Sequence, residues 1–597
     1  MKPEHSERIQ ALRELMAQRG IDAYIVPSTD EHHSEYVPDC AKRIQWLTGF
    51  TGSAGTLVVT SQKACLWTDG RYHLQAREEL DPELVILFPL GLSGVPELQD
   101  WLACEMGSGT KVGVDSKLIS VEEAQRLRER LAKKGAELLC SGENLVDLIW
   151  EQRPRPPWGR IFALQNSFTG SSVQEKLARV RGEMARMGVQ ALLLSGLDEV
   201  AWLSNLRGSD VAYNPVFLGY VLVSMDKAAL FLHPEKLASE AAQAIGAHME
   251  LRPYQELAQA VSQEAMRGSR FWLDPGRTSL WVRELVGNKA SHLEARSPVC
   301  SLKAVKNQVE REGMKNCHLR DGLAMVRFLR WLEQEAPGSW PTEMEAARHL
   351  EELKAQLPYH HGPSFETIVA YGPHGAIVHY RPTPETDLRL GPQGLLLVDS
   401  GAHYLDGTTD VTRTVALGPP TEEQMDRYTR VLKGHVALAR ARFPRDTSGK
   451  QLDVLARLPL WDVGLDYRHG TGHGIGCFLN VHEGPQSISP RDPGVPLEPG
   501  MFVSNEPGYY REGAYGIRIE SVMMVEEDPD AETDYGPFLR FEVVTLVPLD
   551  RRLISPRLLS PAEREWVNSY HARVLESLGP HLDGDDLKWL RRVTKPI

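Results

Sequence analysis

The sequence predicts an α/β (α+β) protein in three parts, two copies of one α/β domain followed by a larger mixed domain. The first half contains an internal repeat, a proline-rich segment separates its two copies, and five potential metal ligands lie in the last third. These three observations place the domains at residues 1–160, 161–305 and 306–597.

Each copy of the repeat has the pattern of a helix, a glycine stop and a buried strand. An amphipathic stretch runs through Gly20 into the apolar segment 21–26, and a second runs through Gly188 into 189–194. Glycine commonly follows a helix end, and short apolar runs are typical of buried strands. Similar segments then follow in both copies, WLTGFTG at 46–52 and WLSNLRG at 202–208. Two copies of one α/β domain are the simplest explanation.

Changes in composition mark the domain borders. The prolines of RPRPPW at 153–158 favour extended chain and cannot continue a helix. A charged stretch from Lys303 to Arg311 then leads into a long helical pattern, which opens the third domain. The tail from Pro561 to Ile597 has helical spacing, and we expect it to cover one face of that domain.

Composition excludes several classes of protein. The net charge of −13 comes from 67 basic and 80 acidic residues that are spread along the chain, so no nucleic-acid or membrane-surface partner is indicated. The seven cysteines are odd in number and never form CxxC, which is typical of reduced thiols. The N-terminus lacks an apolar signal core, and no apolar run is long enough to span a membrane. We therefore expect a cytoplasmic protein.

Five residues have the chemistry of a two-metal site: Asp399, Asp410, His473, Glu506 and Glu520. Four carboxylates and one imidazole are mostly hard ligands, which suit Mn²⁺ and tolerate Fe²⁺, Co²⁺ or Zn²⁺. Four carboxylates also balance the charge of two divalent cations. A hydroxide that bridges the metals would then be the nucleophile of a hydrolase.

Asp399 and Asp410 indicate a metal site only when they are considered as a pair. An apolar segment delivers Asp399, and a β-branched segment surrounds Asp410. A reversal between residues 404 and 405 would place them directly opposite, with Cβ atoms ~5 Å apart. The Asp406-Gly407 turn signal lies off that centre, so this register needs a bulge or a longer loop. Either aspartate alone would be read as a turn or cap residue.

His473 lies in the glycine-rich segment HGTGHGIG at 469–476, where glycines let the backbone approach a site closely. The spacing fits neither GxGxxG nor a P-loop, so phosphate binding is rejected. A lone histidine in such a loop is weak support for a metal site. His482, nine residues on, strengthens it.

Glu506 and Glu520 lie in extended segments. Pro507 biases Glu506 towards extended backbone. Strand alternation puts Arg518 and Glu520 on one face. Arg518 then either orients a ligand carboxylate or forms an ordinary ion pair with Glu520.

These motifs resemble the pita-bread metallopeptidases, and specifically the three-domain aminopeptidase P (Xaa-Pro aminopeptidase) subfamily, over essentially the whole chain. The matching segments are FTGSAG at 50–55, TDGRY at 68–72, VDSG at 398–401, DGTTDVTRT at 406–414, HGTGHGIG at 469–476, VHEGP at 481–485, NEPGYY at 505–510 and GIRIE at 516–520. The resemblance implies two creatinase-like N-terminal α/β domains and a pita-bread catalytic domain. TDGRY occurs only in the first copy, so that copy alone is expected to contribute to substrate binding.

The resemblance also implies a role for each metal ligand. Asp399 would be the terminal ligand of one metal, and His473 with Glu506 would be the terminal ligands of the other. Asp410 and Glu520 would bridge both. Glu506 would also help to activate the bridging water.

Further residues are implied at the substrate. His379 and His482 would hold it and stabilise the tetrahedral intermediate, and His469 and Arg71 would bind it. A core hydrogen-bonding role is the alternative for each histidine.

The implied activity is hydrolysis of the N-terminal X-Pro bond of short peptides with proline at the second position. The resemblance also implies a homodimer and two divalent metal ions, for which Mn²⁺ is the favoured identity. A prolidase or a methionine aminopeptidase uses the same five-ligand pattern, but the duplicated N-terminal half argues against both. A non-catalytic pita-bread binding protein is the alternative from another class. Such a protein would be expected to lose ligands, and here all five are present.

Overall fold

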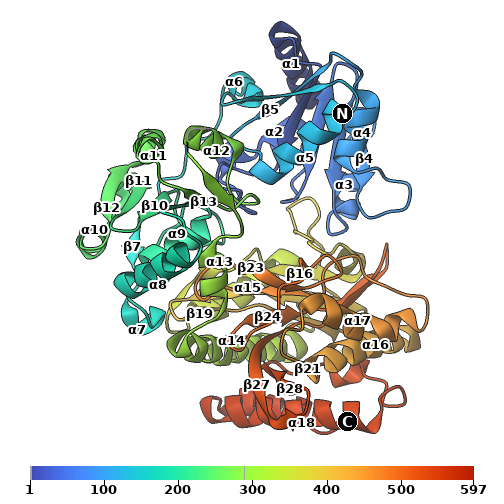
Figure 1. Cartoon of the computed structure of the whole chain (residues 1–597). Helices are drawn as coiled ribbons and strands as arrows, with labels where there is room; N and C mark the ends of the chain where they lie inside the picture. The colour runs from blue at the N-terminus through green and yellow to red at the C-terminus, as the bar shows by residue number, and fades with distance from the viewer. Residues whose placement is uncertain (1–2, 288–289) are drawn as a thin grey trace. The chain divides into compact units, whose positions relative to one another are not determined.

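The computed structural model describes residues 3–287 and 290–597, which fall into two compact units (Figure 1). Unit 1 comprises Met1–Leu164 and Ser171–Cys300, and unit 2 comprises Gln165–Gly170 and Ser301–Ile597. The predicted border between the first two domains falls inside unit 1. The domain borders therefore stay a prediction.

Unit 1 contains two six-stranded sheets of the same topology. The first runs β4-β3-β2-β1-β5-β6 and the second runs β12-β11-β10-β8-β13-β14. In both, two antiparallel pairings follow one another and the outer pairings are parallel. The strands are β1 Ala23–Pro27, β2 Thr56–Thr60, β3 Ala64–Thr68, β4 Ile86–Pro89, β5 Lys111–Asp115, β6 Glu137–Ser141, β8 Ala191–Leu194, β10 Tyr220–Ser224, β11 Ala228–Leu232, β12 Glu250–Pro253, β13 Phe271–Leu273 and β14 His292–Glu294, with a separate pair β7 Phe162–Ala163 and β9 Leu206–Arg207. The predicted duplication is confirmed.

Helices cover these sheets. They are α1 Pro3–Arg19, α2 Arg43–Thr48, α3 His73–Glu79, α4 Leu98–Glu105, α5 Val121–Ala132, α6 Leu145–Ile149, α8 Val173–Arg186, α9 Leu197–Ser204, α10 Ser239–Gly246, α11 Leu257–Met266 and α12 Leu280–Val286, with short 3₁₀ turns η1 Asp39–Ala41, η2 Pro234–Lys236 and η3 Tyr254–Glu256. Gly20 and Gly188 follow α1 and α8, each with φ of +64°. A residue with a Cβ is strained at such a φ, so glycine ends both helices as the sequence predicts.

Unit 2 is built on antiparallel strands. A three-stranded sheet runs β16-β17-β20 and a six-stranded sheet runs β21-β28-β27-β24-β22-β23, with the smaller sheets β15-β18-β19 and β25-β26. The strands are β15 His360–Pro363, β16 Ile368–Tyr371, β17 Leu395–Ser400, β18 Ala402–Tyr404, β19 Gly407–Thr408, β20 Val411–Ala416, β21 Arg442–Pro444, β22 Gly472–Gly474, β23 Glu483–Ile488, β24 Phe502–Asn505, β25 Gly508–Arg511, β26 Tyr515–Arg518, β27 Ser521–Thr533 and β28 Gly536–Val543.

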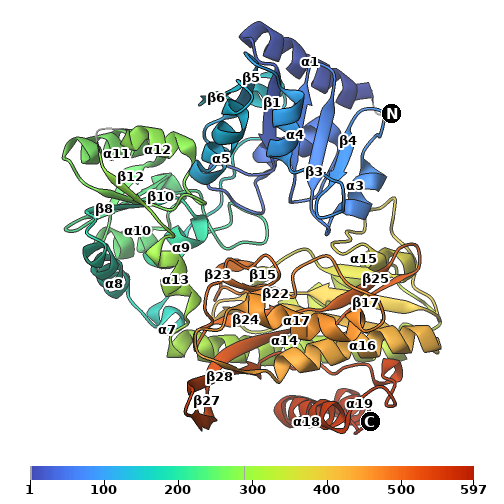
Figure 2. The ribbon, with the colours of Figure 1, turned by 45° about the vertical axis from the view of Figure 1, so that its right-hand side comes forward.

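The helices of unit 2 pack against these strands, and Figure 2 shows α14 and α16 running along one face of them. They are α7 Asn166–Thr169, α13 Pro298–Ala304, α14 Gln308–Gln334, α15 Glu343–Ala355, α16 Glu422–Ala439, α17 Gly449–Trp461, α18 Pro561–Leu578 and α19 Gly584–Val593, with the turns η4 Gly372–Ala376, η5 Arg551–Leu553 and η6 Gly579–His581. The predicted covering role of the C-terminal tail is confirmed, because Val567, Val574 and Leu590 are buried in the main core of this unit.

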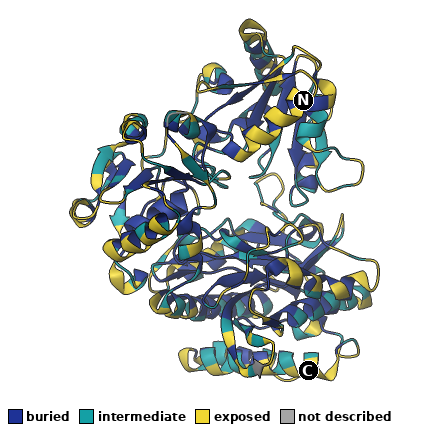
Figure 3. Ribbon diagram, viewed as in Figure 1, coloured by how far each residue is buried: buried dark blue, intermediate teal, exposed yellow. Residues whose placement is uncertain are grey.

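Figure 3 shows the strands of both units mostly buried and the outer sides of the helices exposed. Within residues 3–287 and 290–597, no helix has both the length and the apolar character that a membrane crossing requires.

Candidate metal centre

The two aspartates predicted as ligands lie on neighbouring antiparallel strands. Asp399 is in β17, and Asp410 directly precedes β20. The predicted register is wrong, because Asp399 lies opposite Thr412 rather than Asp410. Tyr404 pairs with Gly407, which leaves residues 405 and 406 as the turn.

Packing against Gly407 explains the difference. A Cβ at this position would lie 2.5 Å from Sγ of Cys317 and 3.2 Å from the Cα of Met314, so only glycine fits beside α14. This contact fixes the turn, and it is invisible in the local sequence. Asp399 and Asp410 thus become diagonal neighbours on one face of the sheet, with Cα atoms ~7–8 Å apart. Carboxylates on one face at this spacing can still reach a shared ligand.

His473 lies in β22, and its ring faces two of the predicted carboxylate ligands. Its Nε2 is 3.4 Å from Oδ2 of Asp410 and 3.4 Å from Oε1 of Glu506, and its Nδ1 faces the carbonyl oxygen of Gly474 at 2.9 Å. The backbone N–H of His473 donates to Ser504 Oγ at 2.9 Å, and that hydroxyl donates to Oε1 of Glu506 at 3.1 Å. One serine therefore ties the imidazole and the carboxylate together.

The glycines around His473 allow β22 to lie against β24. A Cβ on Gly472 would lie 1.9 Å from the carbonyl oxygen of Ser504. Glu506 continues from β24, and its N–H donates to the carbonyl oxygen of Thr471 at 2.8 Å. The glycine-rich segment thus sets the approach of His473 to Glu506.

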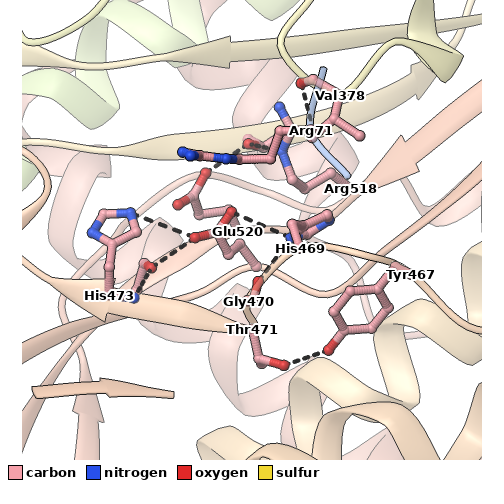
Figure 4. A network of polar contacts seen from close by, with 12 residues as sticks. Arg71, Val378, Tyr467, His469, Gly470, Thr471, His473, Arg518 and Glu520 are labelled. Atoms are coloured by element: carbon pink, nitrogen blue, oxygen red, sulfur yellow. Dashed lines mark hydrogen bonds and ion pairs between the residues drawn. The ribbon is translucent and has the colours of Figure 1, made fainter. Parts of the chain in front are cut away.

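Glu520 completes the cluster from the end of the β26 segment. Its Oε2 accepts from Thr412 Oγ1 at 2.6 Å, and its N–H donates to the Thr412 carbonyl oxygen at 3.1 Å. One ligand atom each of Asp410, His473 and Glu520 lie within 4.8 Å of one another. Figure 4 shows His473 and Glu520 on facing sides of this cluster.

The cluster concentrates negative charge in a buried place. Burial raises the pKa of Asp399, Glu506 and Glu520, and the carboxylate of Asp410 raises each of them further. Burial on its own would lower the pKa of His473, but Asp410 and Glu506 raise it to about 9. The raised carboxylate pKa values therefore come first from burial and then from like-charged neighbours, whereas the raised pKa of His473 comes from neighbours of opposite charge.

The residues fit divalent cations. Oδ1 of Asp399 is buried, and within the described part of the chain it has no hydrogen-bond partner. A buried carboxylate oxygen without a partner is costly unless a cation completes it. The oxygen-rich donor set with one imidazole suits first-row divalent metals.

Arg518 contributes a buried guanidinium group that contacts the cluster. It is 2% exposed, and its Nη2 donates to Oδ2 of Asp399 at 2.5 Å. Its Nε donates to Thr412 Oγ1 at 3.1 Å, and its Nη1 donates to the Tyr510 hydroxyl at 2.9 Å. Of the two roles considered for Arg518, these contacts match the orientation of a ligand carboxylate.

Two of the predicted substrate histidines lie beside the cluster. The ring of His482 meets that of His473 edge to face, with centroids 4.3 Å apart. His469 Nε2 pairs with the Tyr510 hydroxyl at 2.8 Å, and its Nδ1 is 4.0 Å from Oε2 of Glu506.

His379 and Arg71 lie on other segments. His379 is half-buried in the turn that follows η4 in unit 2. Arg71 belongs to unit 1, where its Nη2 pairs with Oδ2 of Asp69 at 2.8 Å. The roles of both stay predictions.

The structure adds residues that sequence reasoning missed. Thr412 bonds Glu520 and Arg518, and its spacing from Asp410 on one strand face could have indicated it. Tyr510 joins Arg518 to His469. This tyrosine ends the NEPGYY segment at 505–510, but the segment alone does not show its partners.

A second missed group is a buried charge cluster beside His482. Lys303 Nζ lies 2.8 Å from Oε2 of Glu483, and Lys306 pairs with the other carboxylate oxygen. All three side chains are at most 1% exposed. Glu483 directly follows His482, so this cluster fixes the chain at that histidine.

Profiles of known families match four parts of the chain. Metallopeptidase family M24 matches residues 312–527, and the C-terminal region of peptidase M24 matches 537–597. Two forms of the creatinase/prolidase N-terminal domain match 8–153 and 152–310.

Similar proteins span the whole chain. Proteins named "Probable Xaa-Pro aminopeptidase P" from Coprinopsis cinerea and Tuber melanosporum are each 44% identical over 99% of this chain, and the match covers 98% and 99% of their own lengths. The X-prolyl aminopeptidase of Caenorhabditis elegans, described as a cytosolic enzyme with a di-nuclear active site, superposes with a TM-score of 0.96. That match has 38% identity and covers 99% of this chain and 100% of the solved one.

Proposed function

The chain belongs to the Xaa-Pro aminopeptidase P group of metallopeptidase family M24, and from this membership we propose that it removes the N-terminal residue of short peptides whose second residue is proline. The observation that carries the proposal is the convergence of Asp410, His473 and Glu520 to within 4.8 Å, with Asp399 and Glu506 beside them.

We propose that the site holds two divalent cations. Mn²⁺ is the favoured metal, and Zn²⁺, Co²⁺ or Fe²⁺ are the alternatives. Asp399 would bind one, His473 and Glu506 the other, and Asp410 and Glu520 both. The neighbour described with a di-nuclear active site supports this number. Two such cations polarise a carbonyl and supply hydroxide as the nucleophile at neutral pH.

The protein's own groups then handle protons and orientation. Glu506, whose Oε1 lies 3.4 Å from Nε2 of His473, would accept the proton of the attacking water. His482, whose ring lies against that of His473, would donate to the carbonyl oxygen as charge develops on it. His379 would be a second donor, and His469 would hold the peptide.

The proposed specificity follows from the chemistry of the X-Pro bond. Its nitrogen carries no hydrogen, so a protease that recognises the amide N–H cannot bind it in the usual way. A site that activates the carbonyl and the water does not need that N–H.

Two further features belong to the proposal. A homodimer is supported by the exposed apolar face of α17, where Val454, Leu458 and Trp461 are 41%, 51% and 46% exposed. Their spacing of four and three residues puts them on one side of the helix, and exposed apolar surface of this kind is typical of interaction sites. A cytoplasmic location is supported by seven free cysteines and by the cytosolic relative.

Matched peptides test the function. Metal-stripped protein should regain hydrolysis of X-Pro-Y peptides when Mn²⁺ is restored, and X-Ala-Y peptides should be cleaved far more slowly. Equal cleavage of both peptides, or full activity after exhaustive chelation, would contradict the proposal. Leu458→Arg should shift the sedimentation of the protein towards the monomer if α17 lies in a dimer interface.

A further inference from the structure

Glu343 is a fully buried carboxylate that the proposed mechanism does not use. It is 0% exposed and is the first residue of α15, directly after the N-cap Thr342. A helix N-terminus favours a negative charge, but a buried carboxylate still needs donors for its oxygen atoms. Among the residues that the structure describes, the donors to Glu343 come from outside its own helix.

Four groups donate to this one carboxylate. The backbone N–H groups of Tyr371 and Leu388 lie 2.7 Å and 3.0 Å from it. The Tyr380 hydroxyl donates to Oε2 at 2.9 Å, and His374 Nδ1 lies 3.0 Å from both oxygens. Three of these four groups lie within residues 371–380, which we call the His379 segment because it contains that histidine.

The His379 segment is also held from the side of the metal centre. Gly375 packs on β26 so closely that a Cβ on Gly516 would lie 1.6 Å from the Gly375 carbonyl oxygen. Arg518 Nη1 donates to the carbonyl oxygen of Val378 at 3.3 Å, as Figure 4 shows. Val378 and Tyr380 are the two neighbours of His379, so one is tied to Arg518 and the other to Glu343.

The aromatic rings make this arrangement stiff. The His374 ring stacks on Tyr380 with centroids 4.3 Å apart, and both rings contact the same carboxylate. Charge-assisted hydrogen bonds of this kind are about twice as strong as neutral ones. The position of His379 therefore depends on Glu343 through the neighbouring tyrosine.

Glu345 shows what an ordinary carboxylate does at the same helix end. Its side chain accepts from the backbone N–H of Thr342 at 2.8 Å in a capping box and is exposed. It completes the capping box, so the helix does not need Glu343 for its own cap.

We propose that Glu343 is a positioning residue for His379, which it holds at the substrate by fixing Tyr380 and the turn before it. The inference rests on the proposed function, because His379 acts there as a donor to the substrate. A misplacement of about 1 Å can cost about 100-fold in rate. Loss of the Glu343 charge should therefore reduce kcat strongly while the protein still folds.

A double-mutant cycle on the metal-loaded enzyme tests this. Glu343→Gln should lower kcat about tenfold or more with both metals retained and little change in KM. In a His379→Ala background the same substitution should lower kcat less than about twofold further, because the residue through which it acts is gone. An equal fall of kcat in both backgrounds, or loss of metal from Glu343→Gln, overturns the proposal.

Two further variants serve as controls for this cycle. Glu345→Gln changes a carboxylate of the same helix turn and should leave kcat unchanged. Tyr380→Phe removes one hydroxyl and keeps the ring on His374, so it should fold normally and lower kcat by a smaller factor than Glu343→Gln. If Tyr380→Phe is fully active, the link through this tyrosine is wrong.

A readout without turnover separates this inference from the proposed function. In Zn²⁺-loaded protein, the Hε1 NMR signal of His379, identified by its loss in His379→Ala, should shift or broaden in Glu343→Gln while that of His482 stays in place. An unchanged His379 signal contradicts the positioning role of Glu343, even if the protein cleaves X-Pro peptides. A shifted signal in a protein that cleaves no X-Pro peptide supports the positioning and contradicts the function.

Discussion

The guanidinium of Arg518 donates to the carboxylate of Asp399 at 2.5 Å, and both side chains are buried. The same guanidinium reaches Thr412, Tyr510 and the Val378 carbonyl. It therefore links Asp399, a predicted metal ligand, to Thr412, which also bonds Glu520, and to the His379 segment. Lysine has no planar fork and cannot make these contacts together.

Arg518→Lys should keep the charge and lose the geometry. We expect metal affinity or kcat to fall about 10-fold to 100-fold, as is usual when a group that orients a metal ligand is changed. Metal titration and kcat on an X-Pro tripeptide measure this. Arg511→Lys is the matched control, because Arg511 lies in the same hairpin and pairs with Glu423, which is not one of the predicted ligands. Similar effects of both substitutions would contradict the role of Arg518.

Asp410→Asn should remove at least one metal from the site. Asp410 lies 3.4 Å from His473 and raises the pKa of Asp399, Glu506 and Glu520, so it is electrostatically central to the cluster. Elemental analysis of the purified variant measures the loss. If the variant binds two metal ions with unchanged affinity, Asp410 is not a bridging ligand.

His473→Ala and His482→Ala should differ in metal content although their rings touch. His473→Ala should lose metal along with activity. His482→Ala should retain metal and lose about 10²–10³ in kcat, which is the usual cost of one preorganised donor. Metal loss from His482→Ala, or a fall in kcat below about fivefold, would show that His482 has another role.

Arg71→Ala should raise KM about tenfold for peptides longer than a dipeptide, as expected for the loss of a contact of ~1.4 kcal/mol. Arg71 pairs with Asp69, so the thermal midpoint must be measured beside the kinetics. Arg77→Ala, on the exposed side of α3, is the control and should leave KM unchanged. An equal rise of KM for dipeptides and longer peptides would exclude a role in length selection.

Stability should fall in acid because two histidines are buried in the neutral form. Burial lowers the pKa of His435 to about 3 and that of His571 to about 4. A folded-state pKa below the unfolded value of about 6.5 means that the unfolded chain binds more protons between these values. The stabilisation is therefore complete above pH ~6.5 and is lost as the pH falls towards 4.

His571 offers the clean test of this pH dependence. His571→Gln can still accept from the Leu549 N–H, which lies 3.1 Å from Nε2. It should reduce the slope of unfolding free energy against pH between about 4.5 and 6.5 by at most ~1.4 kcal/mol per pH unit. His248→Gln changes an exposed histidine and should leave the slope as it is. A slope that is the same in all three proteins would rule out His571 as a cause.

The duplicated half could be predicted, and candidate ligands could be named, because both signals are local. Helix, Gly20 and strand follow one another in the chain, and the sheets β4-β3-β2-β1-β5-β6 and β12-β11-β10-β8-β13-β14 then repeat one topology. Carboxylates in strand-like segments and a histidine among glycines are likewise visible without a structure. Residue type alone fixes their ligand chemistry.

The register of the aspartate hairpin could not be predicted, because a contact distant in sequence decides it. The Asp406-Gly407 signal was visible, but the packing of α14 on Gly407 moves the turn to residues 405 and 406 and puts Thr412 opposite Asp399. A shift of two residues keeps the same faces, so the predicted ligands stayed on one side of the sheet.

The sequence by itself determined the duplicated architecture of this protein and named candidate metal ligands in strand-like segments. Only the tertiary structure decided their partners, because Arg518 reaches Asp399 across 119 positions and Glu343 reaches Tyr380 from a separate helix. Periodicity and turn preferences describe neighbours along the chain. Hydrogen bonds between buried charged groups depend on how the elements pack, and it is this packing that brings Arg518 to Val378 and Glu343 to Tyr380, the two chain neighbours of His379.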